Sequence, residues 1–124
     1  MKKDNVILDK SFDFAVRIVN LYKHLTAEKK EFVLSKQLVR SGTSIGANVS
    51  EAVRAQSTAD FVAKLSIALK EANETDYWLR LLYKTEYLTA KEYDSINNDV
   101  NEIVSILVSI LKTTKGGKIP NSEF

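Results

Sequence analysis

Hydrophobic residues recur along most of the chain at intervals of three and four residues, which is the spacing of one face of a helix. Four such segments follow one another and predict helices over about 9–25, 27–55, 58–87 and 90–113. Residues 1–8 are expected to be a frayed lead-in, and residues 114–124, which contain two glycines and a proline, a flexible tail. The pattern therefore predicts a single all-α domain, an antiparallel up-down-up-down four-helix bundle.

Short capping signals set the expected boundaries of these helices. Thr26 is the expected cap of the second helix, and Ser57 with Asp60 resembles a capping box at the start of the third. Thr89 and Glu92 form a T-x-x-E capping box that opens the fourth helix. Each connection is only a few residues long, so consecutive helices are expected to be antiparallel.

The stretch 37–51 carries an apolar and a polar stripe at helical spacing, with small residues between them. Glycine inside a helix costs roughly 1 kcal/mol against alanine, so Gly42 and Gly46 predict the close approach of another helix. If this helix forms a hairpin with the next one, Arg40 is expected to pair with Glu74. The expected inter-helix polar network consists of Gln37, Arg40, Ser44, Asn48, Glu51, Glu71 and Glu74.

Two helices carry more apolar surface than one core needs. In the first helix the apolar face is wide enough to meet two neighbours and consists of Phe12, Ala15, Val16, Ile18, Val19, Tyr22 and Leu25. In the fourth, only two serines interrupt the apolar residues over 103–111, so a second buried surface is expected there. The residues expected at a subunit interface are Trp78, Ile103, Val104, Ile106, Val108 and Leu111.

The composition fits a helical globular domain, with 44% hydrophobic and 27% charged residues, four glycines and one proline in 124 residues. The chain has no cysteine, which excludes disulfides and thiolate ligands. It also shows no basic-then-apolar leader, so the expected location is the cytoplasm. No apolar run approaches the roughly 20 residues of a membrane span, and no membrane association is expected.

The charge is distributed unevenly along the chain. The net charge is +2, made up of +4 over residues 1–56 and −2 over residues 57–124. This is a mild basic bias, short of the clustered stripe that identifies a nucleic-acid-binding protein. The candidate phosphate contacts are Lys29, Lys30, Lys36, Arg40 and Arg54, with a solvated charged face as the alternative reading.

Aromatic residues concentrate on the third predicted helix. Tyr77, Trp78, Tyr83 and Tyr87 are candidate stacking surfaces for bases. Aromatic side chains on a long bundle helix are, however, more typical of a core or a subunit interface.

Catalytic and metal chemistry find little support. His24 is the single histidine, and zinc sites and nucleophilic triads need more than one histidine or cysteine. A di-iron bundle needs Glu-x-x-His motifs, and no histidine follows Glu71 or Glu74. Glu51, Glu71 and Glu74 could act as acid and base only in a cleft that perturbs a pKa, and structural salt bridges explain them better. We expect no enzyme activity, metal or cofactor.

Three stretches resemble one protein family. They are S-F-D-F-A-V-R-I-V-N-L-Y, L-x-x-Q-L-V-R-S-G-T-S-I-G-A-N-V-S-E-A and S-I-A-L-K-E-A-N-E-T-D-Y-W-L-R-L-L. Together they resemble the small four-helix-bundle proteins encoded in intervening sequences of bacterial 23S ribosomal RNA genes, over about residues 11–111. The resemblance implies a homopentamer with a central axial opening. A related group serves diversity-generating retroelements, where a basic pentamer engages a reverse transcriptase and nucleic acid.

The resemblance also bears on individual residues. At Asn73 many relatives have arginine, and the lost positive charge weakens the expectation of a strongly basic surface. At Ala52 many have glycine, which leaves the fold expectation intact. No catalytic activity is established for the family, so no active site is implied. The patterned positions of the family fall on Gln37, Arg40, Ser44, Ile45, Asn48, Glu51, Glu71, Glu74 and Trp78.

Two functions are therefore expected, and the first is preferred. The first is a non-enzymatic homo-oligomer, a pentamer, that binds RNA, DNA or a ribonucleoprotein partner; five chains of charge +2 would concentrate about +10 in one ring. The second is a protein-interaction scaffold with no direct nucleic-acid role, favoured by the near-neutral charge and the apolar surface of the last helix.

Overall fold

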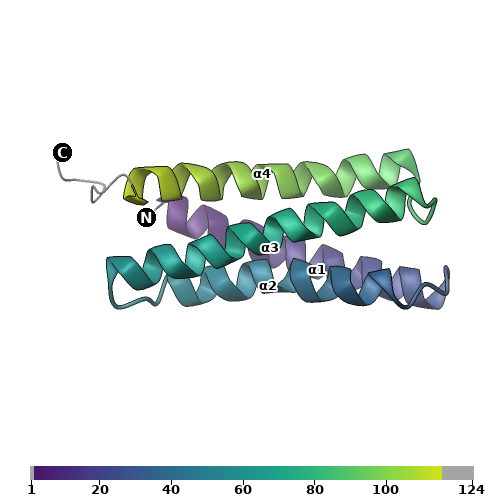
Figure 1. Ribbon diagram of the computed structural model, residues 1–124, viewed down its shortest axis with the longest axis horizontal. Helices are drawn as coiled ribbons and strands as arrows, with labels where there is room; N and C mark the ends of the chain where they lie inside the picture. Colours follow the sequence, from purple (N-terminus) through teal and green to yellow (C-terminus); the bar gives the residue numbers. More distant parts are fainter. Residues whose placement is uncertain (1, 116–124) are drawn as a thin grey trace.

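Four helices make up the part of the chain that the computed structural model describes, residues 2–115. They are α1 (Lys2–Ala27), α2 (Leu34–Ala52), α3 (Thr58–Lys84) and α4 (Ala90–Lys115). Short connections reverse the chain between consecutive helices (Figure 1). No strand occurs among these residues. The predicted all-α, up-down-up-down four-helix bundle is confirmed.

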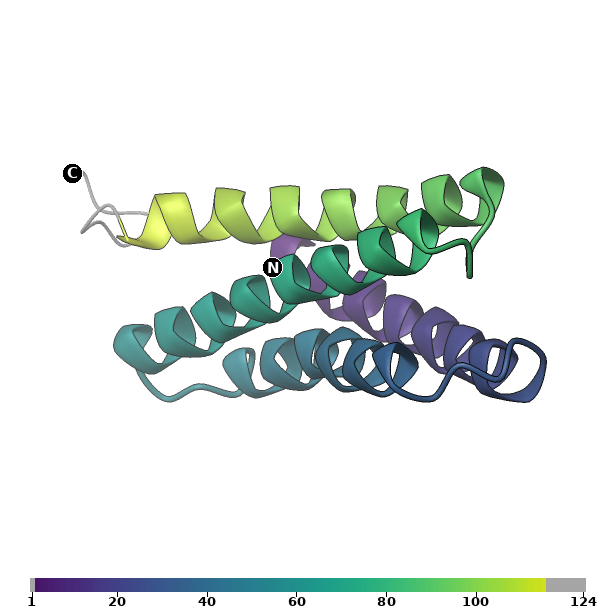
Figure 2. The same cartoon turned by 45° about the vertical axis from the view of Figure 1, so that its right-hand side comes forward.

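Each helix packs on its neighbour in the chain, and α1 also packs on α4, which closes the bundle. Figure 2 shows that α1 runs obliquely to α4 and diverges from it toward the end where α1 stops and α4 begins. At that end a cleft of about 490 Å³ lies between the two helices, with Leu21 and His24 on one side and Ile96 on the other. The bundle is therefore closed along most of its length and open at one corner.

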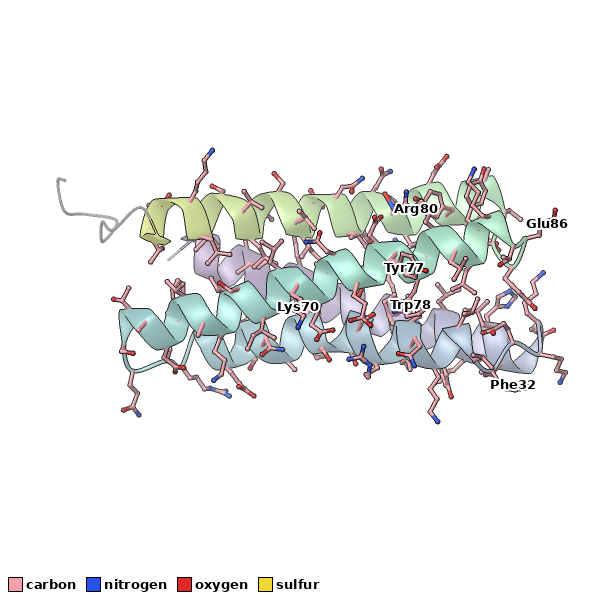
Figure 3. All side chains as sticks on the ribbon, in the orientation of Figure 1. Phe32, Lys70, Tyr77, Trp78, Arg80 and Glu86 are labelled. Carbon is pink, nitrogen blue, oxygen red and sulfur yellow. The ribbon has the colours of Figure 1, made fainter. Side chains whose placement is uncertain are left out.

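The core is built from aliphatic residues of all four helices. Phe14 and Ile18 of α1 are almost fully buried, as are residues from each of the other helices. Polar and charged side chains project outward from this core (Figure 3). The largest fully buried side chains are Ile7, Phe14, Ile18, Leu25, Leu38, Ile45, Val49, Leu65, Leu79, Leu82, Ile103 and Leu107.

The two glycines of α2 lie where α1 crosses it. A Cβ atom at Gly42 would come within 2.8 Å of Cγ2 and 2.9 Å of Cγ1 of Ile18. A Cβ atom at Gly46 would lie 3.1 Å from the backbone oxygen of Ser11. The predicted close approach of another helix is confirmed, and α1 is the helix that approaches.

The predicted starts of the first two helices are wrong. Helix α1 already begins at Lys2, so most of the expected lead-in is helical, and Ile7 is buried in the core. The second helix begins at Leu34, and Thr26 lies in the last turn of α1, where its hydroxyl donates to the carbonyl oxygen of Tyr22 (3.0 Å). The residues Ala27 to Val33 thus end one helix and connect it to the next instead of opening α2.

The later boundaries agree more closely with the prediction. The hydroxyl of Ser57 accepts a hydrogen bond from the backbone N–H of Asp60 (3.0 Å) at the start of α3. The capping box of α4 is complete, because Thr89 and Glu92 each accept a hydrogen bond from the other's backbone N–H (3.1 and 2.8 Å). Helix α3 ends three residues before the expected Tyr87, and α4 continues two residues past 113. Most of the expected tail, 116–124, lies outside the described residues.

Helix α1 buries only part of the apolar face expected for it, because Ile18 and Leu25 lie in the core but other members of that face do not. Phe14 and Ile18 point into the core, whereas Phe12, Val16 and Val19 have exposed fractions of 67%, 46% and 36%. These three side chains recur at steps of four and three residues, so they form a stripe along one side of α1. We call this set, together with the half-buried Ala15, the α1 stripe. An apolar helix face is left uncovered by the bundle.

Candidate functional site

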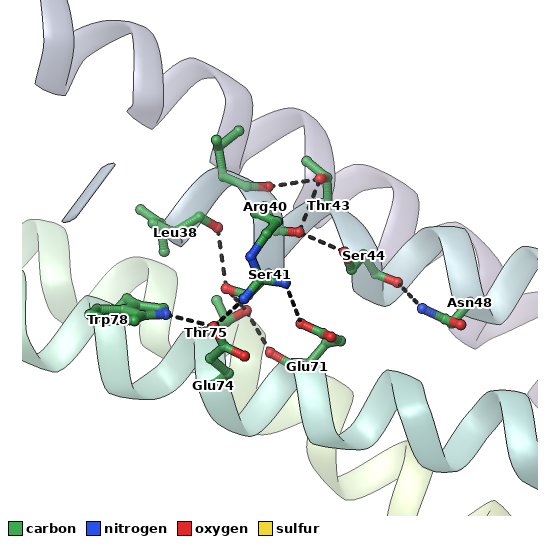
Figure 4. A network of polar contacts seen from close by, with 11 residues as sticks. Leu38, Arg40, Ser41, Thr43, Ser44, Asn48, Glu71, Glu74, Thr75 and Trp78 are labelled. Atoms are coloured by element: carbon green, nitrogen blue, oxygen red, sulfur yellow. Dashed lines mark hydrogen bonds and ion pairs between the residues drawn. The ribbon is translucent and has the colours of Figure 1, made fainter. Parts of the chain in front are cut away.

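The predicted ion pair between Arg40 and Glu74 is present and joins α2 to α3 (Figure 4). The same guanidinium group lies 3.7 Å from a carboxylate oxygen of Glu71. That oxygen is buried and has no hydrogen-bond partner among the described residues, so the long ion pair is its main compensation. The indole N–H of Trp78 donates to Glu74 (3.0 Å). Four side chains from two helices thus form one connected group.

The electrostatics of this group favour a permanent ion pair. The hydrogen bond from Trp78 lowers the pKa of Glu74 from its ordinary value, against the opposing effect of burial, and the hydrogen bond and the charge of Arg40 lower it further. Glu74 is therefore an ionised acceptor at neutral pH. A general acid at neutral pH needs a raised pKa instead, so this geometry supports a role in positioning α2 against α3.

A pair of buried hydroxyls lies beside the ion pair. The hydroxyl of Thr75 is 2.9 Å from that of Ser41 and 2.7 Å from the carbonyl oxygen of Glu71 in its own helix. Both side chains are fully buried between α2 and α3. This contact was not predicted, although the hairpin alignment that pairs Arg40 with Glu74 also brings these two positions close together. Facing residues of an antiparallel hairpin have numbers with a nearly constant sum, here 114 and 116.

The remaining members of the expected network do not join it. Ser44 and Asn48 donate to carbonyl oxygens one turn earlier in α2 itself (2.7 and 2.9 Å). Gln37 is exposed, and the exposed Glu51 lies 3.7 Å from the ammonium group of Lys64. The polar stripe of α2 is thus partly a set of contacts within the helix and only partly an inter-helix network.

The structure separates the candidate phosphate contacts from one another. Lys29 and Lys30 lie in the connection 28–33, and Lys36 lies in the first turn of α2. Arg54 lies beyond the other end of that helix, 18 residues after Lys36, which corresponds to roughly 27 Å along a helix axis. The charge of Arg40 is already balanced by two carboxylates. These five residues do not form one continuous patch.

The connection 28–33 contains a carboxylate that the sequence analysis did not identify as functional or structural. Glu31 is only 7% exposed, and it accepts hydrogen bonds from the backbone N–H groups of Val33, Leu34 and Ser35 (3.1, 2.9 and 2.7 Å). Burial alone would raise the pKa of Glu31, but these hydrogen bonds outweigh it and lower the pKa. Glu31 therefore caps α2.

The expected interface residues of α4 are mostly covered by the protein's own core. Ile103 and Leu111 are 1% and 5% exposed, and Val104, Ile106 and Trp78 are half-buried. Val108, at 41%, is the exception. The larger uncovered apolar surface is the α1 stripe, where side chains of Phe12 to Asn20 line a shallow groove of about 260 Å³.

The cleft between α1 and α4 offers few free polar groups. Arg17 lies on its rim and is bound to Asp99 (2.7 Å) and Ser95 of α4. Glu92 is held in its capping box, and its pKa is lowered by the hydrogen bond from the backbone of Thr89. His24 lies in the last turn of α1, where a basic side chain complements the helix dipole. Within residues 2–115, no three histidine, cysteine or acidic side chains come together to hold a metal ion.

None of the helices described is long and apolar enough to cross a membrane.

The fold and the Arg40 group together define a small antiparallel four-helix bundle whose second and third helices are joined by an ion-paired polar cluster. The chain belongs to the family of 23S rRNA-intervening sequence proteins, whose model matches residues 3–109. The family resemblance noted in the sequence is thereby confirmed.

A solved structure agrees with this assignment. The chain is 68% identical to a protein of unknown function from the S23 ribosomal protein family of Bacteroides thetaiotaomicron, with a TM-score of 0.88. The match covers 90% of this chain and 99% of that one. A search of curated proteins found no match.

Proposed function

We propose that this protein is a non-enzymatic, cytoplasmic bundle that assembles into a homopentamer and binds RNA or a ribonucleoprotein partner. The observation that carries the proposal is the α1 stripe, whose three large side chains remain exposed although Phe14 and Ile18 of the same helix are buried. Contiguous apolar side chains on a helix surface are typical of a protein interface. A second copy of the chain would cover this face.

Assembly also bears on RNA binding. One chain has a net charge of only +2, which is too small for strong attraction to phosphate. A ring of five such chains would carry about +10 and would raise the local potential. The family name connects its members with 23S ribosomal RNA genes, and RNA is accordingly the polyanion that we favour.

The state of the acidic residues supports a function without catalysis. Glu71 and Glu74 are paired with Arg40, and Glu31 and Glu92 are used as helix caps. The pKa values of Glu31, Glu74 and Glu92 are lowered from their ordinary value. Their chemistry is used to hold the bundle together.

Light scattering with and without a short structured RNA tests the proposal. We expect a mass about five times the 14.0 kDa of one chain, an increase when RNA is added at low salt, and loss of that increase at moderate salt. A pentamer whose mass does not increase with RNA even at low salt would contradict the proposed RNA binding. A monomer would defeat the assembly part.

One observation favours the alternative of a protein-interaction scaffold with no direct nucleic-acid role. Phe32 and Val33, in the connection before α2, are 60% and 72% exposed. Adjacent exposed apolar residues in a loop suit a protein partner. Capture of a single protein that survives nuclease treatment, together with no RNA-dependent mass, would favour this alternative.

A further inference from the structure

The acidic and basic side chains of α3 lie on different sides of the helix. This helix carries four basic and four acidic residues, so its sequence has no net charge. Three of the acidic residues turn sideways: Glu71 and Glu74 contact Arg40 of α2, and Asp76 accepts a hydrogen bond from Asn97 of α4 (2.8 Å). The fourth, Asp60, lies in the first turn of the helix. The outward face of α3 is left without acidic side chains from residue 70 to residue 84.

Three of the four basic residues of the same helix point outward. Lys70, Asn73, Tyr77, Arg80 and Lys84 are all exposed and follow one another at steps of three, four, three and four residues, so they share one face. Figure 3 shows Lys70, Tyr77 and Arg80 from the middle of α3 toward its C-terminal end. We call these five residues the α3 face.

The three cations of the α3 face are available to a ligand. Within the part of the chain that the structure describes, none of them lies in an ion pair of 4.0 Å or less, whereas Lys64, Arg17 and Lys10 all do. The ammonium group of Lys84 lies 5.7 Å from the ring centre of Tyr83, which leaves its hydrogen-bond donors unused. Lys70 is near enough to Glu74 to contribute to its lowered pKa, without a direct contact.

An aromatic ring lies in the middle of this row of cations. Tyr77 is 52% exposed and makes an edge-to-face contact with Trp78, with ring centres 5.0 Å apart and an interplanar angle of 78°. Trp78 is itself held by its hydrogen bond to Glu74. The ring of Tyr77 therefore rests against a fixed neighbour, and enough of it is exposed to contact a ligand.

We propose that the α3 face binds single-stranded RNA, with Tyr77 stacking on an unpaired base and Lys70, Arg80 and Lys84 contacting phosphates. The cations span 14 residues, or about 21 Å along the helix, which allows contacts to several consecutive nucleotides. Paired bases do not expose their faces, so an aromatic platform between cations suits a single strand better than a duplex. This inference rests on the proposed RNA-binding function and names its surface.

The rival surface is the connection 28–33 with the start of α2, where Lys29, Lys30 and Lys36 lie near the exposed Phe32. The exposed Glu28 lies in the same connection and reduces its positive charge. The acidic residues nearest the α3 face, Glu71, Glu74 and Asp76, are half-buried and bound to side chains of α2 or α4. This difference in exposure favours the α3 face.

Fluorescence anisotropy with a labelled single-stranded oligouridine of about twenty nucleotides tests this surface. We expect Tyr77→Ala to weaken binding about tenfold, because one base–aromatic stack is lost, and the matched Tyr77→Phe to bind like the unchanged protein. Replacing Lys70, Arg80 and Lys84 together by glutamine should reduce the slope of log affinity against log salt by about 2. Light scattering and circular dichroism check that each variant keeps its mass and helix content.

A second triple variant, Lys29→Gln, Lys30→Gln and Lys36→Gln, serves as the matched control and should bind nearly normally. If this control loses binding while the α3 variants keep it, the α3 face is wrong and the proposed function stands. If the unchanged protein fails to bind the oligonucleotide and structured RNA at low salt, both are wrong. Loss with Tyr77→Ala but not with Tyr77→Phe supports the α3 face specifically.

Discussion

The carboxylate of Glu31 replaces a conventional cap at the start of α2. The residue at the N-cap position, Val33, offers no side-chain hydrogen bond. The carboxylate of Glu31 instead accepts hydrogen bonds from three backbone N–H groups that follow it. The backbone carbonyl oxygen of Glu31 also accepts a hydrogen bond from the hydroxyl of Ser35 (2.8 Å). Since the N-terminal N–H groups of a helix otherwise lack partners, this one side chain supplies partners for the N–H groups at the start of α2.

Glu31→Gln should lower the free energy of unfolding at pH 7 by about 1–3 kcal/mol, because charge-assisted hydrogen bonds to a buried acceptor are replaced by weaker ones. The pKa of Glu31 is lowered in the folded state, so its contribution is present above the ordinary value of 4.5 and is lost as the pH falls below that value. Urea unfolding at pH 7 and at pH 3 should therefore show the two proteins converging in acid.

Glu28→Gln is the matched control for this experiment, because Glu28 lies in the same connection and is exposed. We expect it to change stability by less than about 0.5 kcal/mol at either pH. If the difference in the free energy of unfolding between Glu31→Gln and the unchanged protein is the same at pH 7 and pH 3, the capping role is contradicted.

Sequence reasoning found some residue contacts and missed others for a physical reason. The pair of Arg40 and Glu74 follows from the register of two adjacent antiparallel helices, which the period of the pattern determines. The cap by Glu31 depends on the path of an irregular connection. The sequence offers there a more familiar capping residue, Thr26, whose hydroxyl is used inside α1 instead.

The contact between α1 and α2 depends on the absence of side chains at two positions of α2. Ile18 is fully buried and β-branched, and its Cβ, Cγ1 and Cγ2 atoms occupy the space that a side chain at Gly42 would need. A β-branched side chain has little rotamer freedom inside a helix, so Ile18 cannot easily turn away. The close approach of the two helices thus follows from Gly42 and Ile18 together.

Gly42→Ala should destabilise the protein by up to about 2 kcal/mol, although alanine is intrinsically the better helix former by about 1 kcal/mol. The clash with Ile18 causes the loss, so Gly42→Ala made in an Ile18→Ala background should become neutral or stabilising. Chemical unfolding of the two single variants and the double variant measures this coupling. Stabilisation by Gly42→Ala alone would show that the helices can move apart at little cost.

The sequence predicts one wide apolar face on α1, and the breadth of the pattern leaves open which part of that face is buried. Apolar residues occur on two sides of this helix, so a period of 3.6 residues fits either face. Which side turns inward is decided by the glycines of α2, because only the face with Ser11 and Ile18 fits against them. The number and order of the helices were predictable, whereas the rotation of α1 about its axis was not.

The part of the molecule that the structure describes presents an apolar and a basic face to the outside. The α1 stripe is apolar, and the α3 face is basic with an exposed aromatic ring. In a fivefold ring, neighbouring subunits must join through two different patches, because such a ring has no twofold axis within an interface. The α1 stripe of one subunit then needs a complementary patch elsewhere on the next subunit, and Val108 of α4 is an exposed apolar candidate for it.

Charged substitutions on α1 and α4 test which surfaces form the subunit interface of the proposed assembly. Phe12→Glu with Val16→Glu should reduce the mass in solution to about 14.0 kDa, since two carboxylates would have to be buried in the subunit interface. Both positions are exposed in the single chain, so the helix content should change little. If Val108→Glu alone also abolishes assembly, an equimolar mixture of the two variants should form dimers, because each retains one intact patch. An unchanged mass for the α1 variant would exclude the α1 stripe as the interface.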